Sequence, residues 1–449
     1  MISKVLSELS NFVWGLPLLF LLVGAALYFN ILLAFKPVTK LGLAIRLMRS
    51  RGQGKGQIPS FQALTNALAA TVGMGNIAGV AVALTLGGPG ALLWMWIAAL
   101  LGVTLKFSET AAVMLHRGED VYGETQGGAM YIYEQIFDGK FRWVGKSFAF
   151  LGLIGTLSLF QINQMSSYLE SEYNFEPLYV GIVVAVVVFI ILIGGVRRLG
   201  SFTKYVIPFM GVLYLTVGLI VILKQIDRLP IVLSSIFRGV LHPEEFIAGT
   251  GVGLLITLKN GFRRAAFSNE AGVGTAPMAH GNAQVEEPIE EALVAGIGPV
   301  FDTLMICTLT GIMILLSLDC SIIESGGGLK LVSLAFKENF GDYGKYLLSI
   351  VVFCFSFTTL VGMSNYNEKC WTYLFGKYLK NGTLFVIFYC ATIIIGSVFK
   401  SNDVINLMDA TYGLMALPNI IALLVLSKKI KQSSQAYFEG KKNGSSSSS

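Results

Sequence analysis

The stretch that decides the fold is Ala69-Ala70-Thr71-Val72-Gly73-Met74-Gly75-Asn76-Ile77-Ala78-Gly79, together with Gly272-Val273-Gly274-Thr275. Each set lies inside a long apolar segment, and Gly73 and Gly272 are 199 positions apart. A helix in lipid satisfies its own backbone hydrogen bonds, so a glycine-broken helix in a membrane leaves amides and carbonyls that need a partner. Paired breaks of this kind are typical of the midplane site of a secondary transporter.

Composition indicates that the chain belongs in a bilayer. Hydrophobic residues make up 54% of the chain and charged residues only 13%, about half the charge of soluble domains. Apolar runs of spanning length occur in eleven places, at 11–36, 60–86, 90–115, 143–168, 177–197, 202–224, 248–282, 290–318, 343–366, 382–399 and 403–427. We therefore predict an all-α polytopic membrane protein with 11 transmembrane helices and the lipid bilayer as a partner.

The distribution of basic residues predicts the orientation. The loop at 36–55 carries six Lys or Arg and no acid, which places it in the cytoplasm by the positive-inside rule. The N-terminus is then extracellular and, after eleven spans, the C-terminus is cytoplasmic, as Lys428, Lys429 and Lys431 also indicate. We expect a multi-pass protein of the cell membrane. The net charge of +6 needs no nucleic acid, because the bases cluster in short loops, and no obligate protein partner is evident.

The second half of the chain repeats the spacing of the first. With Gly73 matched to Gly272, the spans that begin near 90, 143, 177 and 202 match those near 290, 343, 382 and 403. The second broken helix comes five spans after the first, an odd number, so the two enter from opposite faces and the repeats are inverted. This predicts a LeuT-type 5+5 inverted-repeat core preceded by one extra helix, with chance spacing as the alternative. The expected parts are an extra helix and basic loop at 1–59, the first repeat at 60–226, an outer connecting segment and the second repeat at 227–430, and a flexible cytoplasmic tail at 431–449.

The first break offers backbone groups of both signs. A helix that ends near Val72 and restarts near Asn76 presents the amides of Met74, Gly75 and Asn76 at a positive dipole end, which suits a carboxylate. The carbonyls of Ala69 to Val72, at a negative end, suit a hard cation such as Na⁺ or a proton-carrying water. Thr71 and Asn76 flank the break and favour a binding site over a small-residue packing face, which stays the alternative. No strand precedes the Gly-x-Gly and no acid follows it between residues 80 and 105, which excludes a dinucleotide site.

The second break carries side chains rather than bare backbone. Residues 259–272 read KNGFRRAAFSNEAG, and charges inside a span are costly and usually functional. We expect Phe267 to limit the side chain of a solute, Ser268 and Asn269 to bind its polar ends, and Glu270 to hold a cation or a salt-bridge partner. Arg263 and Arg264 lie one turn outward and are expected to form an outer gate with Asp409, and Glu270 belongs to the same predicted gate. The alternative is that these bases pair locally with Glu270 and stiffen the bend.

Polar residues on other spans extend the predicted site. Gln161 and Gln164 share one face of the fourth span and are expected to line the central cavity. Hydroxyl groups of the ninth span could complete a cation site with Ala69 and Val72, although Ser and Thr in membrane helices more often bond their own backbone. The ninth-span residues are Phe355, Ser356, Thr358 and Thr359. Structural pairing is expected for Lys106, Glu109 and Asp302.

The chain lacks the motifs of enzymes. His116, His242 and His280 lie near span ends without a ligand spacing, and no HExxH, GxSxG or phosphate-binding loop occurs. The five cysteines are odd in number and mostly apolar in context, which predicts packing residues rather than disulfides. We predict no catalytic residue. Transport then depends on an ion gradient or is passive.

Two motifs resemble those of the alanine or glycine:cation symporter family. Residues 87–97, GGPGALLWMWI, are similar to that family's GG-x-GA…F-W-M-W signature, with Leu93 in place of the phenylalanine. Residues 267–277, FSNEAGVGTAP, are similar to its FSNEAG-x-G-[ST]-AP segment. The resemblance covers the chain to about residue 430. It implies uptake of alanine or glycine with Na⁺, or with H⁺ in some members, through a LeuT-type core. The change at Leu93 is expected to affect packing rather than activity.

The resemblance also implies two binding sets. A cation would meet Ala69, Val72, Phe355, Thr358 and Thr359, and substrate would meet Thr71, Met74, Gly75, Phe267 and Ser268. We expect Na⁺ as the coupling ion and no other cofactor. A passive small-solute channel and a H⁺-coupled amino-acid transporter are the alternatives. A substrate receptor is a third, although no soluble signalling domain is attached.

Overall fold

The structure is a computed structural model and describes residues 2–49, 54, 56–193, 195–242, 253–379 and 382–446. The first half comprises α1 Ile2–Val13, α2 Leu16–Leu32, α3 Lys36–Thr39, α4 Leu41–Met48, α5 Ser60–Thr71, the 3₁₀ turn η1 Met74–Asn76, α6 Ala78–Gly87, α7 Gly90–Leu115, the strands β1 Gly118–Glu119 and β2 Thr125–Gln126, α8 Ala129–Gln135, η2 Ile136–Gly139, α9 Arg142–Gly155, α10 Leu159–Tyr173, α11 Pro177–Leu192, α12 Gly195–Lys224, η3 Ile226–Arg228 and α13 Leu229–Leu241. The second half comprises α14 Gly253–Asn269, α15 Pro277–His280, α16 Pro288–Ala295, α17 Ile297–Pro299, the π-helical turn η5 Val300–Cys307, α18 Thr308–Ser317, α19 Cys320–Ser325, α20 Gly328–Phe340, α21 Tyr343–Phe375, α22 Gly382–Val398 and α23 Ser401–Ser446. The two short strands form an antiparallel hairpin.

Membrane-length helices dominate the described part of the chain. Six are long and apolar enough to cross a bilayer, at Gly90–Leu115, Arg142–Tyr173, Ser201–Lys224, Pro288–Ser317, Tyr343–Phe375 and Ser401–Gly440. Two bent pairs, α1 with α2 and α5 with η1 and α6, also pass as spans, and α11 and α22 are shorter apolar helices. The protein is therefore a helical multi-pass membrane protein. The start of the predicted span 248–282 lies outside the described residues, as do Arg51, Lys55 and the last three residues. The count of eleven and the inverted relation of the halves stay predictions.

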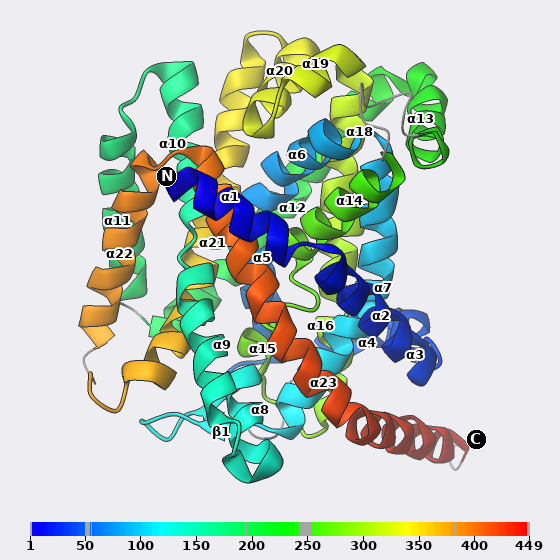
Figure 1. Cartoon of the computed structure of the whole chain (residues 1–449), viewed down its shortest axis with the longest axis vertical. Helices are drawn as coiled ribbons and strands as arrows, with labels where there is room; N and C mark the ends of the chain where they lie inside the picture. Colours follow the sequence, from blue (N-terminus) through cyan, green and yellow to red (C-terminus); the bar gives the residue numbers. More distant parts are fainter. Residues whose placement is uncertain are drawn as a thin grey trace.

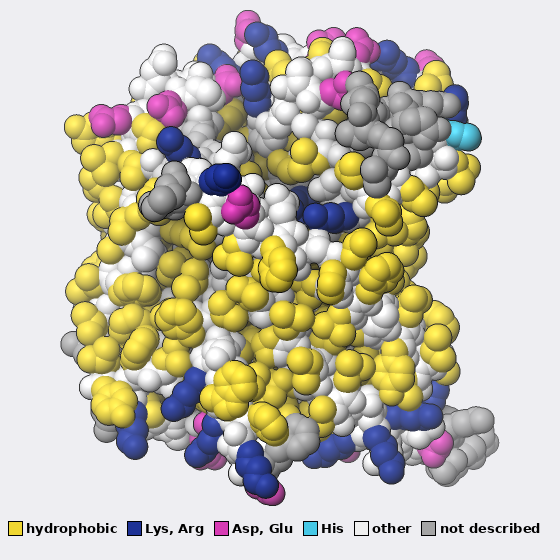
Figure 2. All heavy atoms as spheres, in the orientation of Figure 1, with side chains coloured by type: hydrophobic (Ala, Val, Ile, Leu, Met, Phe, Trp, Pro, Cys, Tyr) yellow, Lys and Arg dark blue, Asp and Glu magenta, His cyan; other side chains and the backbone are white. Residues whose placement is uncertain are grey.

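The surface agrees with a bilayer around the middle of the molecule. Figure 2 shows hydrophobic side chains in a broad band, with most Lys, Arg, Asp and Glu side chains gathered at the two ends. One end carries α13, α19 and α20, and the other carries α8, the β1–β2 hairpin and the C-terminus (Figure 1). We call these the α20 end and the α8 end. Basic side chains are prominent at the α8 end in this view.

Glycines let the broken helices approach their neighbours closely. α5 packs against α12 and α21, and α14 packs against α6 and α7. A Cβ atom at Gly362 of α21 would lie 2.5 Å from the backbone nitrogen of Ala70, and one at Gly261 of α14 would lie 2.7 Å from the carbonyl oxygen of Ala91. Only glycine fits such contacts, so the two broken helices are held in the centre of the bundle.

The ends of the chain differ in detail from the sequence prediction. The predicted first span, 11–36, is instead the pair α1 and α2, bent by 41°. Pro17 explains the bend because it cannot donate a backbone hydrogen bond, and its ring would collide with a preceding helical turn. The predicted flexible tail is helical as far as Ser446, as a continuation of α23.

Candidate functional site

The first break is a 3₁₀ turn held by two side chains. α5 ends at buried Thr71, one residue earlier than expected, and α6 begins at Ala78, two residues after the predicted restart at Asn76. The Gly73 amide donates to Asn76 Oδ1 over 2.9 Å, and the Met74 amide donates to Gln161 Oε1 over 3.0 Å. The amide of Gly75 has no acceptor among the residues that the structure describes. One predicted donor at this helix start therefore stays available to a ligand.

The second break is an irregular segment between α14 and α15. It runs from residue 270 to residue 276, with positive φ at Glu270 (58°), Gly272 (91°) and Gly274 (88°). A left-handed φ is unusual for a side chain as large as glutamate. Thr275 Oγ1 at 2.5 Å and the Tyr412 hydroxyl at 3.1 Å donate to the Glu270 carboxylate. Glu270 therefore bonds its own loop and α23, and does not pair with the arginines as the local-pair alternative expected.

Phe267 closes the space between the two breaks. A Cβ atom at Gly75 would lie 3.2 Å from the Phe267 ring, so the ring covers the exposed backbone of the first break. Phe160 meets Phe267 edge to face with ring centroids 5.3 Å apart, and Tyr412 lies 5.4 Å from it at a tilt. The three rings form an aromatic wall, of which the sequence predicted only Phe267. Phe160 and Tyr412 carry no signal that separates them from other membrane aromatics.

A polar cluster lies beneath Phe267. Asn76 Nδ2 donates to Asp302 Oδ1 over 2.8 Å and to Ser268 Oγ over 3.2 Å, and the Ser268 hydroxyl also donates to Asp302. Asn269 Nδ2 donates to Thr303 Oγ1 over 2.9 Å, and Asn269 Oδ1 accepts from the Ala271 amide over 2.9 Å. The π-helical turn η5 carries both Asp302 and Thr303 to the broken helices. Asn76, Ser268 and Asn269 thus bond within the bundle as well as lying at the predicted site.

The predicted structural pair of Lys106 and Glu109 uses other partners. Lys106 Nζ donates to the carbonyl oxygen of Asn269, and Glu109 Oε1 accepts a hydrogen bond from Asn419 Nδ2 over 2.6 Å. Asn419 also donates to the carbonyl oxygen of Gly272 over 3.0 Å. Both residues therefore support the second break.

The two predicted glutamines lie at different levels of α10. Gln161 reaches the first break, and its Nε2 group has no acceptor among the described residues. Gln164 Oε1 lies 3.3 Å from the position of a Cβ atom at Gly328, at the start of α20. It lines a cavity of about 550 Å³ with Glu172, Lys330 and other residues. Only Gln161 meets the centre.

The predicted cation set comes together between α5 and α21. Thr359 Oγ1 lies 3.2 Å from the carbonyl oxygen of Val72 and 2.9 Å from that of Phe355. Thr358 Oγ1 lies 2.7 Å from the carbonyl oxygen of Cys354 and 3.2 Å from that of Phe355. Ala69, Val72, Phe355, Ser356, Thr358 and Thr359 are each fully buried. A buried group of carbonyl and hydroxyl oxygens without nearby charge suits a monovalent hard cation.

Three of the four predicted gate residues also meet, whereas Glu270 bonds Thr275 and Tyr412 instead. Arg263 Nη2 lies 2.6 Å from Asp409 Oδ2, and Arg264 forms an ion pair with the same oxygen. All three side chains are buried. The Arg264 guanidinium lies 5.5 Å from the centre of the Phe267 ring, so the ion pair with Asp409 packs against the aromatic wall.

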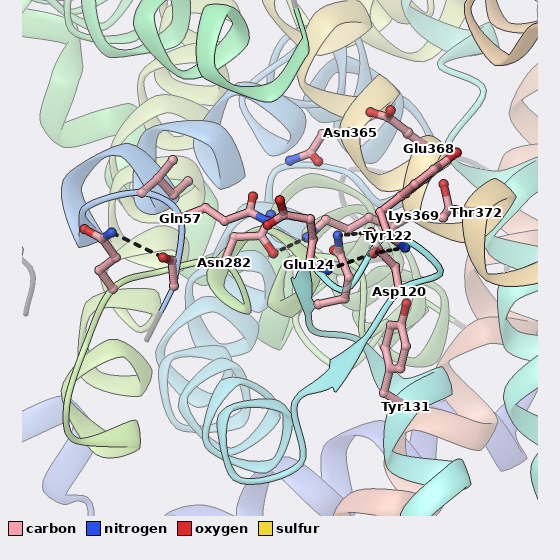
Figure 3. Close-up of a pocket in the computed structure, with 14 residues that line it drawn as sticks. Gln57, Asp120, Tyr122, Glu124, Tyr131, Asn282, Asn365, Glu368, Lys369 and Thr372 are labelled. Atoms are coloured by element: carbon pink, nitrogen blue, oxygen red, sulfur yellow. Dashed lines mark hydrogen bonds between the residues drawn. The ribbon is translucent and has the colours of Figure 1, made fainter. Parts of the chain in front are cut away.

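A cavity at the α8 end was missed by the sequence analysis. It measures about 440 Å³ and is lined by α21, the loop around Gln57 and the hairpin residues (Figure 3). Lys369 donates to the carbonyl oxygen of Met278 and, over 2.9 Å, to Asn282 Oδ1. Gln57 donates to Glu124 Oε2 over 2.6 Å. Glu368 and Lys369 lie beyond the predicted end of the ninth span, which is why they carried no signal.

Comparisons with known proteins agree on one family. The sequence profile of the Sodium:alanine symporter family matches residues 1–449. The chain is 34% identical to "Sodium/alanine symporter AgcS" of Methanococcus maripaludis over 98% of each chain. It is 33% identical to "Probable sodium/glutamine symporter GlnT" of Bacillus subtilis, over 99% of this chain and 92% of GlnT. It is 35% identical to an uncharacterized transporter of Haemophilus influenzae, over 98% of this chain and 96% of that protein.

One solved structure shares the fold. It is MhsT in complex with L-phenylalanine, with a TM-score of 0.57, 16% sequence identity, and coverage of 84% of this chain and 90% of MhsT. This likeness supports a LeuT-like arrangement of the helices.

Proposed function

The chain belongs to the sodium:alanine symporter family, and from this membership we propose that it carries alanine or glycine across the cell membrane together with Na⁺. At the coarser level the protein is a cation-coupled amino-acid symporter and not an enzyme. The observation that carries the finer proposal is the meeting of the two broken helices, where the ring of Phe267 covers the backbone of Gly75.

The centre suits a small zwitterion. The solute's carboxylate meets the Gly75 amide and the Gln161 Nε2 group, both without protein acceptors among the described residues. Its ammonium meets carbonyl oxygens of the broken segments near Thr71 and Phe267. Met74 and Ser268 complete the walls. A helix start stabilises a carboxylate without a buried basic side chain, and the Phe267 ring over Gly75 favours a solute with a small side chain.

Several predicted contacts become indirect in this proposal. Asn76 Oδ1 accepts from the Gly73 amide and Asn76 Nδ2 donates to Asp302 and Ser268. Asn269 Nδ2 donates to Thr303 Oγ1, and Asn269 Oδ1 accepts from the Ala271 amide. In this proposal, Asn76 and Asn269 stabilise the conformation of the two broken segments and do not contact the solute directly. Gln164 lines the cavity at the α20 end, which we assign to solute entry, and does not contact the bound solute.

The coupling ion occupies the oxygen group between α5 and α21. Its ligands are the carbonyl oxygens of Ala69, Val72 and Phe355 and the hydroxyl groups of Thr358 and Thr359. Because Val72 lies on the broken helix and Thr359 on its neighbour, an ion here stabilises their contact. That linkage couples the ion to the arrangement of the first break.

Alternating access then needs one closed side at a time. The α20 end faces outward and the α8 end faces the cytoplasm, in keeping with the basic side chains at the α8 end in Figure 2. Arg263, Arg264 and Asp409 close the outer route. The contacts of Lys369 and Gln57 around the cavity of Figure 3 close the inner route.

Initial rates of radiolabelled alanine uptake test the proposal. Purified protein in proteoliposomes receives an inward Na⁺ gradient, an inward proton gradient, or neither. We expect fast uptake only with Na⁺. Uptake driven equally by the proton gradient would move the coupling to H⁺, and uptake that ignores both gradients would indicate a passive channel.

A further inference from the structure

The extra N-terminal helix contacts both partners of the gate ion pair, Arg263 on α14 and Asp409 on α23. α1 lies along α23, which carries Asp409 (Figure 1). Ser10, in the last turn of α1, accepts a hydrogen bond from Arg263 Nη2 of α14. Trp14, directly after α1, donates from Nε1 to the carbonyl oxygen of Asp409 over 2.8 Å. The segment from Ser10 to Trp14 therefore contacts the arginine and the aspartate of the gate at once.

These contacts are buried and closely fitted. Ser10 and Trp14 are 0% and 1% exposed. A Cβ atom at Gly413 of α23 would lie 2.4 Å from Val13 Cγ1 and 3.1 Å from Trp14 Nε1, so only glycine lets the segment seat on α23. Val13 and Trp14 share an apolar cluster with Ala266 of α14 and Ala416 of α23. The segment is thus anchored to the gate helices by packing as well as by hydrogen bonds.

The Ser10 hydroxyl compensates part of the excess positive charge at the gate. Two buried arginines share one oxygen of a single buried carboxylate, which leaves positive charge in excess. Buried charge is costly unless hydrogen bonds compensate it. The Ser10 hydroxyl accepts from Arg263, and the C-terminal end of α1 adds the negative end of a helix dipole beside the same guanidinium.

We infer that Ser10 and Trp14 are positioning residues of the outer gate: Trp14 fixes the N-terminal segment to Asp409 and α23, and Ser10 holds Arg263 in the closed arrangement. The inference rests on the gate role proposed above. The gate opens when α14 and α23 separate, and the segment stays with α23 through its packing. Opening then breaks the hydrogen bond between Ser10 and Arg263, so this bond stabilises the closed state alone.

Accessibility of one native cysteine measures the gate directly. Cys307 is buried below the gate, with its Sγ 3.1 Å from Ser268 Oγ. In a background with Cys320, Cys354, Cys370 and Cys390 changed to serine, Cys307 is the remaining thiol. A membrane-impermeant methanethiosulfonate applied at the outer face labels it only when the gate is open. Ser10→Ala is expected to raise the labelling rate about tenfold, because a hydrogen bond to a charged group contributes about 1.5 kcal/mol.

Matched variants separate gating from folding. Ser10→Thr keeps the hydroxyl and should restore the parent rate. Ser3→Ala removes another contact between α1 and α23, the 3.0 Å hydrogen bond to Asp403 at the exposed end, and should leave labelling at the parent level. Trp14→Phe, which keeps the aromatic packing, should raise labelling as Ser10→Ala does. Thermal unfolding of each variant should stay near that of the parent.

Equal labelling in the parent and in Ser10→Ala, including no labelling in either, would overturn the inference, as would the same increase in Ser3→Ala. Labelling needs no transported solute, so it tests the positioning role even if alanine proves not to be the substrate. Absence of Na⁺-driven alanine uptake in the parent would instead count against the proposed function alone.

Discussion

At the scale of single residues, we propose that Phe267 limits the room available to a bound solute. Its ring covers Gly75 and is itself held by Phe160 and Tyr412. Phe267→Ala removes the ring and opens space above the first break. We expect leucine and methionine to compete poorly for uptake by the parent and to inhibit labelled alanine uptake by the variant. Competition uptake assays measure this, with Phe353→Ala, on the exposed side of α21, as the control that keeps the parent selectivity. Unchanged selectivity in Phe267→Ala would place the pocket elsewhere.

We propose that the hydroxyl groups of Thr358 and Thr359 set the affinity for the coupling ion. Thr359 Oγ1 joins the carbonyl oxygens of Val72 and Phe355, and Thr358 lies beside it. Thr358→Ala with Thr359→Ala removes both hydroxyls, so the Na⁺ concentration for half-maximal uptake should rise about tenfold or more, since each charged contact contributes about 1.5 kcal/mol. Uptake at varied Na⁺ measures it. Ser349→Ala removes another hydroxyl of α21, one that bonds the carbonyl oxygen of Lys345 and the hydroxyl groups of Tyr168 and Tyr173, and should leave the Na⁺ dependence unchanged. Normal Na⁺ dependence in the double variant would move the cation site.

Individual site residues could be predicted from the sequence where a charged side chain stands inside an apolar span. Arginines and an aspartate inside spans are costly, so Arg263, Arg264 and Asp409 could be predicted to meet, and they do. Glu270 was harder, because its two partners, Thr275 and Tyr412, depend on a left-handed turn that no motif specifies. Gln161 and Gln164 share a helix face, yet the height of each along the bundle comes from packing, and only Gln161 reaches the break.

At the scale of elements, the first break depends on glycine at one position. A Cβ atom at Gly73 would lie 2.2 Å from Thr359 Oγ1, whereas one at Gly79 meets nothing within 4 Å. Gly73→Ala should force α5 and α21 apart, abolish transport and lower the free energy of unfolding by about 1–3 kcal/mol. Gly79→Ala should transport normally and be more stable by about 0.5–1 kcal/mol, since alanine favours helix. Uptake and thermal unfolding measure both. Active transport by Gly73→Ala would contradict the tight contact.

The positions of the helix breaks could be predicted from the sequence, whereas bends and π-helical turns within spans could not. Glycine pairs within apolar runs indicated both breaks, and the structure interrupts the helices there. The bend between α1 and α2 was missed because the apolar run through Pro17 has the length of one span. The π-helical turn at Val300–Cys307 was missed as well, because no glycine or proline inside it marks an interruption of the apolar run.

At the scale of the whole molecule, the orientation makes a prediction about one exposed thiol. Cys320 is exposed on α19, at the α20 end, which the proposal places outside the cell. A membrane-impermeant maleimide should label Cys320 in intact cells, and Cys320→Ser should lose that labelling. Labelling of Cys320 only after the membrane is opened would invert the proposed topology and exchange the outer and inner gates.

The whole account depends on coupling between a solute at the two breaks and Na⁺ beside α21. The most direct measurement is the steady-state accumulation of radiolabelled alanine in proteoliposomes under a maintained inward Na⁺ gradient. We predict that alanine inside rises above its concentration outside, and that a Na⁺ ionophore returns the two to equality. Alanine that only equilibrates across the membrane, whatever the Na⁺ gradient, would contradict the account.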